Sequence, residues 1–340
     1  MMRILTIETT CDETAAAVVT DELQVLSSLV ASQDQLHQRF AGVVPEIAAR
    51  AHVERILPVI DEALSQANTT LFELDAIAVA NTPGLAGSLL VGVVAAKTLC
   101  AASRKPLVAI NHLHAHIYAC RMAAKQEVFP CVGLIVSGGH TSLYRCSGPI
   151  DFEYLGGTID DAAGEAFDKV AAMLGLSYPG GPAVAHAAEG GDERAYQFPR
   201  GLNDSDSLNF SFSGLKTAVR YAVAGPGKPD FSSVKLTAKQ IADLAASFQV
   251  AIVDSLMKKS VSALKKTRLS TLCVGGGVAA NRLLRDRLWA AARKDGFKLH
   301  IAPPELCTDN AVMGAIAFER LRAGAVDNLE LDAIPGLVRH

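Results

Sequence analysis

The stretch ILTIETTCDETAAAVVT at residues 4–20 places two apolar runs on either side of a polar turn. Its runs Ile4–Ile7 and Ala15–Thr20 have the length and composition of β-strands, and the turn between them predicts a hairpin. The stretch VGLIVSGGHTSLYRC at residues 132–146 repeats the same strand, turn, strand pattern. A hairpin that recurs in the second half of a chain indicates an internal duplication.

The residues that follow each hairpin support the duplication. The apolar run Ala76–Ala80 precedes a loop with Pro and Gly and a helical pattern that reaches Leu99. In the second half, Thr271–Val274 precedes Gly275–Gly277 and a helical pattern over Val278–Ala292. This order predicts an α/β, actin-like fold of two lobes built from duplicated RNase H-like halves, as in actin, Hsp70 and sugar kinases. The alternative is a parallel α/β protein whose Gly-rich turns only make tight connections.

The expected domains are an N-terminal actin-like lobe at residues 1–125 and a C-terminal actin-like lobe at residues 126–340. The second is longer because a segment rich in Gly, Pro and Asp, at about 151–251, is inserted between its hairpin and its Gly-rich loop. Long segments of this kind often carry substrate chemistry.

Composition narrows the class of protein. The chain has 340 residues, of which half are hydrophobic and 20% charged, so it is expected to fold into a compact core. The start of the chain lacks the apolar stretch of a signal peptide, and its seven cysteines form no CxxC pair. The most apolar run, Leu85–Leu99, contains two glycines and Lys97. We therefore expect a cytoplasmic protein with no membrane span.

The net charge of −3 disfavours a protein that grips nucleic acid through a broad basic surface. One basic segment is a candidate RNA-binding patch, although solvated helix faces often have the same composition. The segment contains one acidic residue, Asp286. Its basic residues are Lys258, Lys259, Lys265, Lys266, Arg268, Arg282, Arg285, Arg287, Arg293 and Lys294.

Three histidines within five positions suggest a metal site. His112 and His116 are one helical turn apart, so both imidazoles can bind one ion, whereas His114 points elsewhere. Asp309, in a loop before a helix, is the best third ligand. Such a ligand set suits Fe(II), Zn(II) or Mn(II). A metalloprotease is disfavoured because Leu113 stands where the HExxH motif needs its catalytic Glu.

A nucleotide site is expected around the second hairpin turn. Asp161, Glu165 and Asp168 share one face of a predicted helix, and Asp168 is suited to accept hydrogen bonds from ribose hydroxyls. Tyr178–Pro182 predicts a stiff turn, and the Gly275–Gly277 loop with Asn281 behind it would give adenosine a backbone wall and a hydrogen-bond partner. No GxxxxGK[ST] motif is present, which excludes a P-loop enzyme but leaves an actin-like kinase open.

At these residues the sequence resembles the tRNA adenosine threonylcarbamoyltransferase family over nearly the whole chain. The matching motifs are Glu8–Thr14, Gly42–Glu46, the His112/His116 pair, Ser137–Thr141, Asp160–Lys169, Tyr178–Pro182, Phe210–Thr217, Gly275–Asn281 and Cys307–Asn310.

The resemblance implies transfer of the threonylcarbamoyl group from threonylcarbamoyl-adenylate to the exocyclic amine of the adenosine beside the anticodon, in tRNAs that read codons beginning with A. It implies one divalent metal per subunit, usually iron with zinc as the alternative, held by His112, His116 and Asp309. It also implies an adenylate site formed by Ile135, Val136, Ser137, Gly138, Gly139, Asp168, Gly181 and Asn281. Asp12 and Glu13, on the first hairpin turn, are our candidates for the catalytic acids.

The resemblance further implies four partners besides the adenylate. These are tRNA, a bacterial paralogue that lacks the metal histidines, a small P-loop ATPase and a separate enzyme that makes the adenylate. Two departures stand out: His114-Ala115 replaces the usual Glu-Gly, so His114 is a candidate second-shell or competing ligand, and Thr6 stands where Gly is frequent. The alternatives to a transferase are an actin-like small-molecule kinase and a non-enzymatic scaffold of the same complex.

Overall fold

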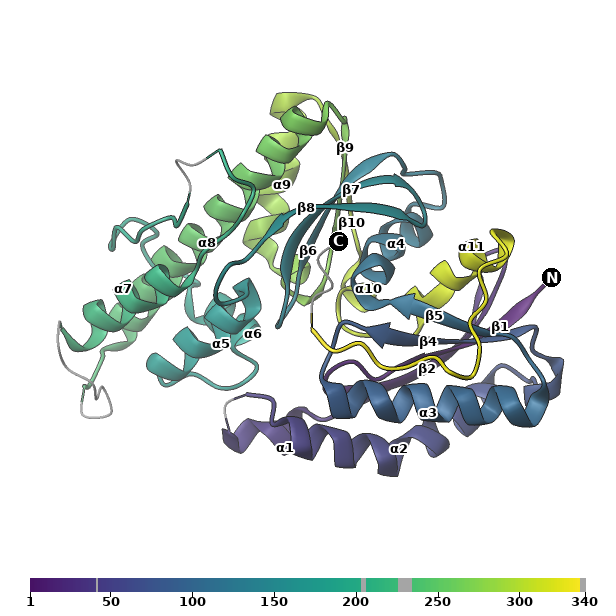
Figure 1. The fold of residues 1–340 in the computed structure, drawn as a ribbon. Helices are drawn as coiled ribbons and strands as arrows, with labels where there is room; N and C mark the ends of the chain where they lie inside the picture. The colour runs from purple at the N-terminus through teal and green to yellow at the C-terminus, as the bar shows by residue number, and fades with distance from the viewer. Residues whose placement is uncertain (41, 203–205, 226–233, 337–340) are drawn as a thin grey trace. The chain divides into compact units, whose positions relative to one another are not determined.

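The computed structural model describes residues 1–40, 42–202, 206–225 and 234–336. The chain divides into two compact units (Figure 1). The first unit contains Met1–Glu127, Gly148–Phe152 and Thr308–His340, and the second contains Val128–Ser147 and Glu153–Cys307. The first break lies close to the expected domain boundary. The difference is at the C-terminus, because the segment from Thr308 onward packs with the N-terminal half and carries Asp309 into it.

The first unit is built on a five-stranded sheet in the order β3-β2-β1-β4-β5. Its strands are β1 (Arg3–Glu8), β2 (Glu13–Thr20), β3 (Val25–Ser32), β4 (Ala76–Thr82) and β5 (Leu107–Asn111). The first three are antiparallel neighbours, and β4 and β5 lie parallel to β1. β1 and β4 are apolar along nearly their whole length because they lie in the middle of the sheet and are buried.

Helices α2 (Pro45–Gln66) and α3 (Ala86–Ser103) lie side by side and pack on this sheet (Figure 1). The short 3-10 helix η4 (Val312–Ile316) packs against β1 and β2 as well as against α4 (His112–Ala124). Thr6 is buried there, and its hydroxyl donates to the carbonyl of Ala311 at 2.6 Å. Gly314 leaves room for it, since a Cβ at Gly314 would lie 2.8 Å from the Cβ of Thr6. The threonine therefore ties the C-terminal segment to β1.

The second unit repeats the same topology. Its sheet has the order β10-β9-β6-β7-β8 and consists of β6 (Cys131–Val136), β7 (Thr141–Gly148), β8 (Asp151–Gly157), β9 (Thr271–Gly275) and β10 (Lys298–Ile301). β7 is antiparallel to β6, and β9 and β10 run parallel to it. Each sheet thus places a hairpin and a third strand on one side and two parallel strands on the other. This match confirms the predicted duplication and the two-lobed α/β fold.

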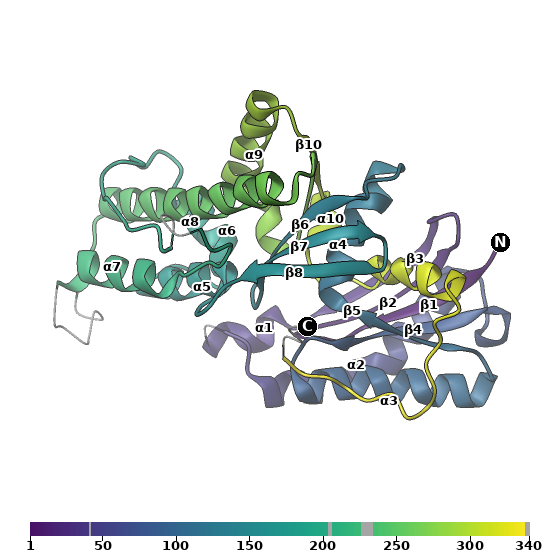
Figure 2. The same cartoon turned by 45° about the horizontal axis from the view of Figure 1, so that its top comes forward.

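β8 is the third strand of this repeat, so the inserted helical segment begins after Gly157 rather than at the expected position near 151. The long helix α8 packs against α6 and α7 (Figure 2). The helices of this unit are α5 (Ala163–Met173), α6 (Gly180–Ala187), α7 (Ser213–Ala224), α8 (Ala238–Thr267), α9 (Arg282–Asp295) and α10 (Pro304–Cys307). The remaining helices of the first unit are α1 (Asp34–His37) and α11 (Ala317–Arg322).

α3 is apolar and long enough to cross a membrane by length and composition alone. Core helices of soluble proteins pass the same test, and α3 packs against α2 and β4. Its buried face includes Leu89, Val93 and Ala96, which join the core of the first unit. The packing favours a core helix over a membrane span.

Candidate functional site

The helix α4 presents two histidines from its first turns. It begins directly after β5, and the side chain of Asn111 caps its N-terminus by accepting hydrogen bonds from the N–H groups of Leu113 and His114, at 2.9 and 3.2 Å. The cap fixes where the helix starts. His112 and His116 consequently lie one turn apart on the same face, as predicted, and both are buried.

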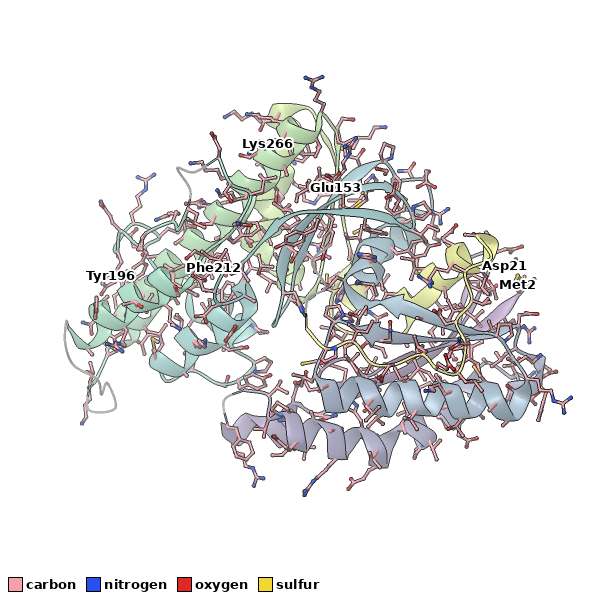
Figure 3. The ribbon with its side chains drawn as sticks, in the orientation of Figure 1. Met2, Asp21, Glu153, Tyr196, Phe212 and Lys266 are labelled. Carbon is pink, nitrogen blue, oxygen red and sulfur yellow. The ribbon has the colours of Figure 1, made fainter. Side chains whose placement is uncertain are left out.

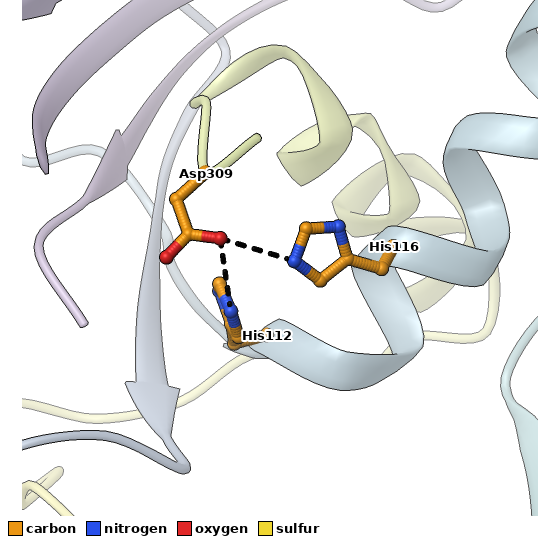
Figure 4. Close-up of side chains that lie close together, drawn as sticks. All are labelled: His112, His116 and Asp309. Atoms are coloured by element: carbon orange, nitrogen blue, oxygen red, sulfur yellow. Dashed lines mark hydrogen bonds and ion pairs between the residues drawn. The ribbon is translucent and has the colours of Figure 1, made fainter. Parts of the chain in front are cut away.

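Asp309 completes the group (Figure 4). Its Oδ1 atom lies 3.5 Å from Nε2 of His112 and 3.2 Å from Nε2 of His116. The three ligand atoms all lie within 4.8 Å of one another, so this group could hold a metal ion. Two imidazole nitrogens and one carboxylate oxygen are the donors that iron(II) and zinc(II) accept. The donor set therefore fits the metal that the sequence led us to expect.

Glu8, the last residue of β1, supports the group from behind. Its Oε2 atom lies 3.0 Å from Nδ1 of His112, and its Oε1 atom accepts the N–H of Thr10 at 2.7 Å. A carboxylate at Nδ1 holds a proton there and leaves Nε2, the nitrogen nearer Asp309, as the atom that can bind a metal. The sequence analysis quoted Glu8 only as part of a motif and gave it no role. Its position, directly after a central strand and before the polar turn, was the available signal.

The two histidines differ in their electrostatics. Burial disfavours the charged form of His112, but the carboxylates of Asp309 and Glu8 outweigh this effect and raise its pKa to about 9. Burial lowers the pKa of His116 below 6.5 despite the hydrogen bond that Asp309 accepts from it. Among the described residues, Nδ1 of His116 has no hydrogen-bond partner. The group carries two negative carboxylates close to two imidazoles, which favours a bound cation.

His114 lies outside this ligand group. Its ring stacks on that of Phe152, with the centroids 4.0 Å apart and the planes at 7°. Burial, followed by the charge of Arg320, lowers the pKa of His114 to about 4. The sequence analysis considered His114 as a second-shell or competing ligand, and the structure instead gives it a packing contact.

Asp12 lies in the turn between β1 and β2 and Glu13 is the first residue of β2, in the same unit as the metal group. Burial, helped by the charge of Asp309, raises the pKa of Asp12, and it raises that of Glu13 well above its usual value. A hydrogen bond between the two favours the proton on Glu13, because it lowers the pKa of Asp12 and raises that of Glu13. The hydrogen bond therefore favours the charged form of Asp12 over the charged form of Glu13.

The loop Ser137–Gly139 in the second unit is shaped by close backbone contacts. The carbonyls of Ser137 and Gly138 accept the N–H groups of Gly164 and Glu165, at the start of α5. A Cβ at Gly164 would lie 2.6 Å from the carbonyl oxygen of Ser137, and one at Gly276 would lie 2.4 Å from that of Val136. Neighbouring glycines thus allow α5 and the end of β9 to approach the loop closely.

Other glycines of this unit face open space. A Cβ at Gly138, Gly139, Gly181 or Gly277 would meet no described atom within 4 Å. Ile135 and Val136 are buried in β6 and direct the chain into the loop, while Gly138 and Gly139 are exposed. Exposed glycine backbone suits the approach of a phosphate or an acyl group.

The remaining expected adenylate residues have partners within the unit. Oδ1 of Asp168 accepts the N–H of Gly180 at 2.7 Å, at the start of α6. Asn281 caps α9 by accepting the N–H of Leu284 at 3.1 Å, and its amide donates to Gln249 at 2.7 Å. The sequence analysis did not single out Gln249 as a partner of Asn281, because Gln249 lies inside the long helix α8 with no motif around it.

Three local expectations for the second unit differ from the structure. α5 starts at Ala163, so Asp161 precedes the helix instead of sharing a face with Glu165 and Asp168. It pairs with Lys169 and Lys216, both at 2.7 Å. The helical run expected from Val278 is a short 3-10 helix, and the Asn281 cap makes α9 begin only at Arg282. In addition, the expected turn at Tyr178–Pro182 already enters α6 at Gly180.

Comparisons with known proteins give the family of the whole chain. A family model described as tRNA N6-adenosine threonylcarbamoyltransferase matches residues 24–316. The protein of that name from Rhodopirellula baltica is 59% identical over 99% of this chain and 97% of its own length. The one from Syntrophobacter fumaroxidans is 50% identical over 98% of each chain.

Solved structures show the same fold at low identity. Full-length HypF in its phosphate- and nucleotide-bound form has a TM-score of 0.63 and 15% identity over 96% of this chain and 56% of its own. Component A of the (R)-2-hydroxyglutaryl-CoA dehydratase of Acidaminococcus fermentans has a TM-score of 0.52 and 13% identity over 95% of this chain and 100% of its own. These neighbours support the actin-like fold alone. The sequence matches decide the rest: this chain belongs to the tRNA N6-adenosine threonylcarbamoyltransferase family.

Proposed function

We propose that this chain transfers the threonylcarbamoyl group from threonylcarbamoyl-adenylate to the exocyclic N6 amine of the adenosine beside the anticodon, in tRNAs that read codons beginning with A. Family membership makes the chain a transferase that acts on tRNA, and this favours the transferase over the kinase and the scaffold. The observation that carries the finer proposal is the group of buried His112 and His116 with half-buried Asp309, in which Glu8 contacts His112. A phosphoryl transfer from ATP does not need such a group.

The reaction forms a C–N bond and breaks a C–O bond. The amine nitrogen attacks the carbamoyl carbon of the mixed anhydride, AMP leaves with the bridging oxygen, and the nitrogen loses a proton. An aromatic amine is a weak nucleophile, so the carbonyl must be activated and the proton removed. A divalent metal at His112, His116 and Asp309, which we propose to be iron(II) with zinc(II) as the alternative, supplies Lewis acidity or orients the threonyl group.

We assign the proton transfer to the acids of the first hairpin turn. We assign Asp12 as the general base because its hydrogen bond with Glu13 favours the charged form of Asp12, and we assign Glu13 as the donor of that bond. The raised pKa of Asp12 makes it a better base than an exposed aspartate. Glu13 keeps the base in place and in its correct charge state.

The adenylate is proposed to bind in the second unit. The exposed backbone of Gly138 and Gly139 would face its phosphate, since neighbouring N–H groups in such a turn attract anions. Asp168 would accept from the ribose hydroxyls. Asn281 and Gly181 would contact the adenosine, together with the buried end of β6 at Ile135 and Val136.

The tRNA is proposed to contact the basic end of the second unit, which we define as Lys265, Lys266, Arg268, Lys294 and Lys298. These residues are exposed at the C-terminal ends of α8 and α9 and the start of β10. The pairing of β9 with β10 brings the two helix ends together, because Lys298 lies opposite Thr271. Figure 3 labels Lys266 at the end of α8. Exposed lysines and arginines bind nucleic-acid phosphates.

Other basic residues of the patch considered earlier serve the fold. Lys259 is buried and donates to the carbonyls of Leu202 and Ser207, both at 2.6 Å. Arg287 pairs with Asp254 at 2.6 Å and Glu193 at 2.8 Å, and Arg285 donates to two backbone carbonyls. The basic end is therefore smaller than the sequence patch from Lys258 to Lys294.

The proposed partners rest on family membership and on an exposed apolar surface. We propose from the family that a separate enzyme makes the adenylate and that a small P-loop ATPase joins the complex. The outer faces of α2 and α3 expose Val53, Leu57, Leu90 and Val94, which are between 49% and 64% exposed. We propose that the paralogue lacking the metal histidines covers this apolar surface. The complex is proposed to work in the cytoplasm, where tRNA is modified.

A reconstituted assay tests the function. The purified chain would be combined with the three protein partners, threonine, bicarbonate, ATP and an unmodified tRNA that reads a codon beginning with A. Nuclease digestion and mass spectrometry should then show threonylcarbamoyl-adenosine with the wild-type chain and none with H112A or H116A. Absence of the product with folded, metal-loaded chain and active partners would refute the proposal.

A further inference from the structure

A chain of hydrogen bonds runs through the interior of the first unit toward the turn that carries Asp12 and Glu13. It links three buried side chains: Gln33 between β3 and α1, His37 in α1 and His52 in α2. No part of the function described so far uses them. Buried polar side chains of this kind carry a cost in stability unless all their groups are paired, so each of their partners is informative.

The first hydrogen bonds of this series determine which nitrogen of His37 carries the proton. The backbone N–H of Val44 donates to Nδ1 of His37 at 3.3 Å, so this nitrogen is the acceptor. The proton of the neutral ring therefore lies on Nε2, which is 3.3 Å from Oε1 of Gln33. The amide nitrogen of Gln33 then points the other way, toward His52, whose Nδ1 lies 3.5 Å away.

The remaining hydrogen bonds of this series determine which nitrogen of His52 carries the proton. The hydroxyl of Thr14 lies 2.7 Å from Nδ1 of His52, which the Gln33 amide also faces. With two donors directed at Nδ1, the ring carries its proton on Nε2. That atom lies 3.0 Å from the carbonyl oxygen of Cys11 and donates to it. Burial lowers the pKa of His52, which keeps the ring neutral and preserves this single tautomer.

The same carbonyl is held from a second side by α3. The hydroxyl of Ser88 donates to the carbonyl of Cys11 at 3.1 Å, and the hydroxyl of Thr9 donates to the carbonyl of Ser88 at 2.9 Å. The N–H of Leu85 donates to the carbonyl of Thr10 at 2.8 Å. The turn is thus held by α2 through one side chain, His52, and by α3 through several contacts.

We propose that His52 is a positioning residue for the catalytic acids: its Nε2–H bond to the Cys11 carbonyl holds the turn so that the next two side chains, Asp12 and Glu13, keep their places. His52 itself does not touch substrate. The inference rests on the proposed role of Asp12 and Glu13. It extends that role to a residue of α2 that lies 41 positions from Cys11 in the sequence.

Two substitutions separate the hydrogen bond from the packing. The amide of a glutamine reaches the place of Nε2 in histidine, whereas the shorter amide of an asparagine reaches only the place of Nδ1. H52Q therefore keeps a donor for the Cys11 carbonyl, and H52N loses it while leaving a polar side chain in the same pocket. I60V, on the buried face of the same helix, serves as the control for a small loss of core packing.

The first measurement is independent of activity. Cys11 is partly exposed, whereas the other six cysteines are buried, so iodoacetamide labelling read by peptide mass spectrometry reports on this turn. Burial raises the pKa of Cys11, so the wild-type thiol should react slowly. We expect H52N to label at Cys11 about tenfold faster or more because the turn opens locally, and H52Q and I60V to label at the wild-type rate.

The second measurement is the transfer reaction with bound metal quantified. H52N should lower kcat by about 10- to 100-fold with the KM for the adenylate and the metal content unchanged, and H52Q should stay within about threefold of wild type. Equal losses in H52Q and H52N, or an unchanged Cys11 labelling rate in H52N, would overturn the proposal. Loss of metal in H52N would also overturn it, since the residue would then act on the metal group.

The failure of the proposed function looks different. If D12N and E13Q are both fully active, the catalytic assignment is wrong whatever His52 does. Faster Cys11 labelling in H52N without any loss of kcat would show that His52 holds the turn but positions no catalytic group, and it would overturn the inference on its own.

Discussion

Nδ1 of His112 and Oε2 of Glu8 lie 3.0 Å apart, although 104 positions separate them in the sequence. The bond joins the first residue of α4 to the last residue of β1. Both side chains are 4% exposed. A buried carboxylate behind a metal-binding imidazole orients the ring and increases its basicity, so Glu8 should matter to the metal as much as to the fold.

Removing Glu8 should weaken metal binding. We expect E8A to lower iron(II) or zinc(II) affinity by about 10- to 100-fold and E8Q to have a smaller effect, because the glutamine amide oxygen still accepts from His112. Competitive chelator titration measures this. E62Q, an exposed substitution in the same unit, should bind metal like the wild type. Wild-type affinity in E8A would show that His112 does not depend on this carboxylate.

The ligand assignment predicts a sharp contrast along one helix. H112A, H116A and D309A should each lose bound metal and transferase activity while remaining folded. H114Q, on the same helix but stacked on Phe152, should keep its metal within about twofold, since its ring is no ligand. Mass spectrometry measures the bound metal of each variant, and circular dichroism shows whether the variant is folded. A metal loss in H114Q as large as in H112A would return His114 to the ligand set.

Asp12 and Glu13 should behave differently when each is neutralised. Wild-type activity should fall on the acid side as pH drops through the raised pKa of Asp12, which lies above the usual 3.8, because protonation removes the base. D12N should lose about 100-fold or more in kcat. E13Q should keep most of its activity, since the amide donates to Asp12 as the protonated acid does. A larger loss in E13Q than in D12N would reverse the assigned roles.

Glu319 offers a test of acid stability away from the reaction. Burial opposes its charge, but hydrogen bonds from Tyr118 and Arg121 outweigh this and lower its pKa below 4.5. A carboxyl with a lowered pKa stabilises the fold above its unfolded value, and this contribution is lost as pH falls through the folded value.

E319Q should therefore lower the free energy of unfolding by about 1–3 kcal/mol at pH 7. The difference from wild type should shrink as the pH is lowered below 4.5, the usual pKa of the acid. Urea unfolding at pH 7 and at a pH below 4.5 measures the difference in unfolding free energy. The exposed Glu54→Gln serves as the matched control variant. A constant difference at all pH values would mean that the charge of Glu319 contributes nothing.

The basic end should set the salt dependence of tRNA binding. Lys265 and Lys239 lie near opposite ends of α8, and Lys239 pairs with Asp243 at 2.5 Å. We expect K265E to weaken tRNA binding several-fold and to reduce the slope of log affinity against log salt by about 1, the loss of one phosphate contact. K239E should leave both unchanged. Filter binding at a series of salt concentrations measures the affinity and its salt dependence. Equal effects of K265E and K239E would mean that the tRNA does not contact the basic end.

Short-range patterns determined a large part of this protein. The strands β1, β2, β6 and β7 were predictable because apolar alternation and polar turns act within a few residues. Their recurrence revealed the duplication. The His112/His116 pair was predictable for the same reason, since a helix places positions four apart on one face.

The tertiary structure decided which distant residues meet. Only the fold could place Glu8 behind His112, stack His114 on Phe152, and bring the C-terminal segment with Asp309 into the N-terminal unit. The cap at Asn281, which sets where α9 begins, also depended on the surrounding packing, because the Asn281 amide bonds to Gln249 of α8. The sequence by itself determined the elements and the ligand types, because these follow from local backbone preference and side-chain chemistry. Contacts between residues a hundred or more positions apart depend on how whole elements pack, and no local pattern records that.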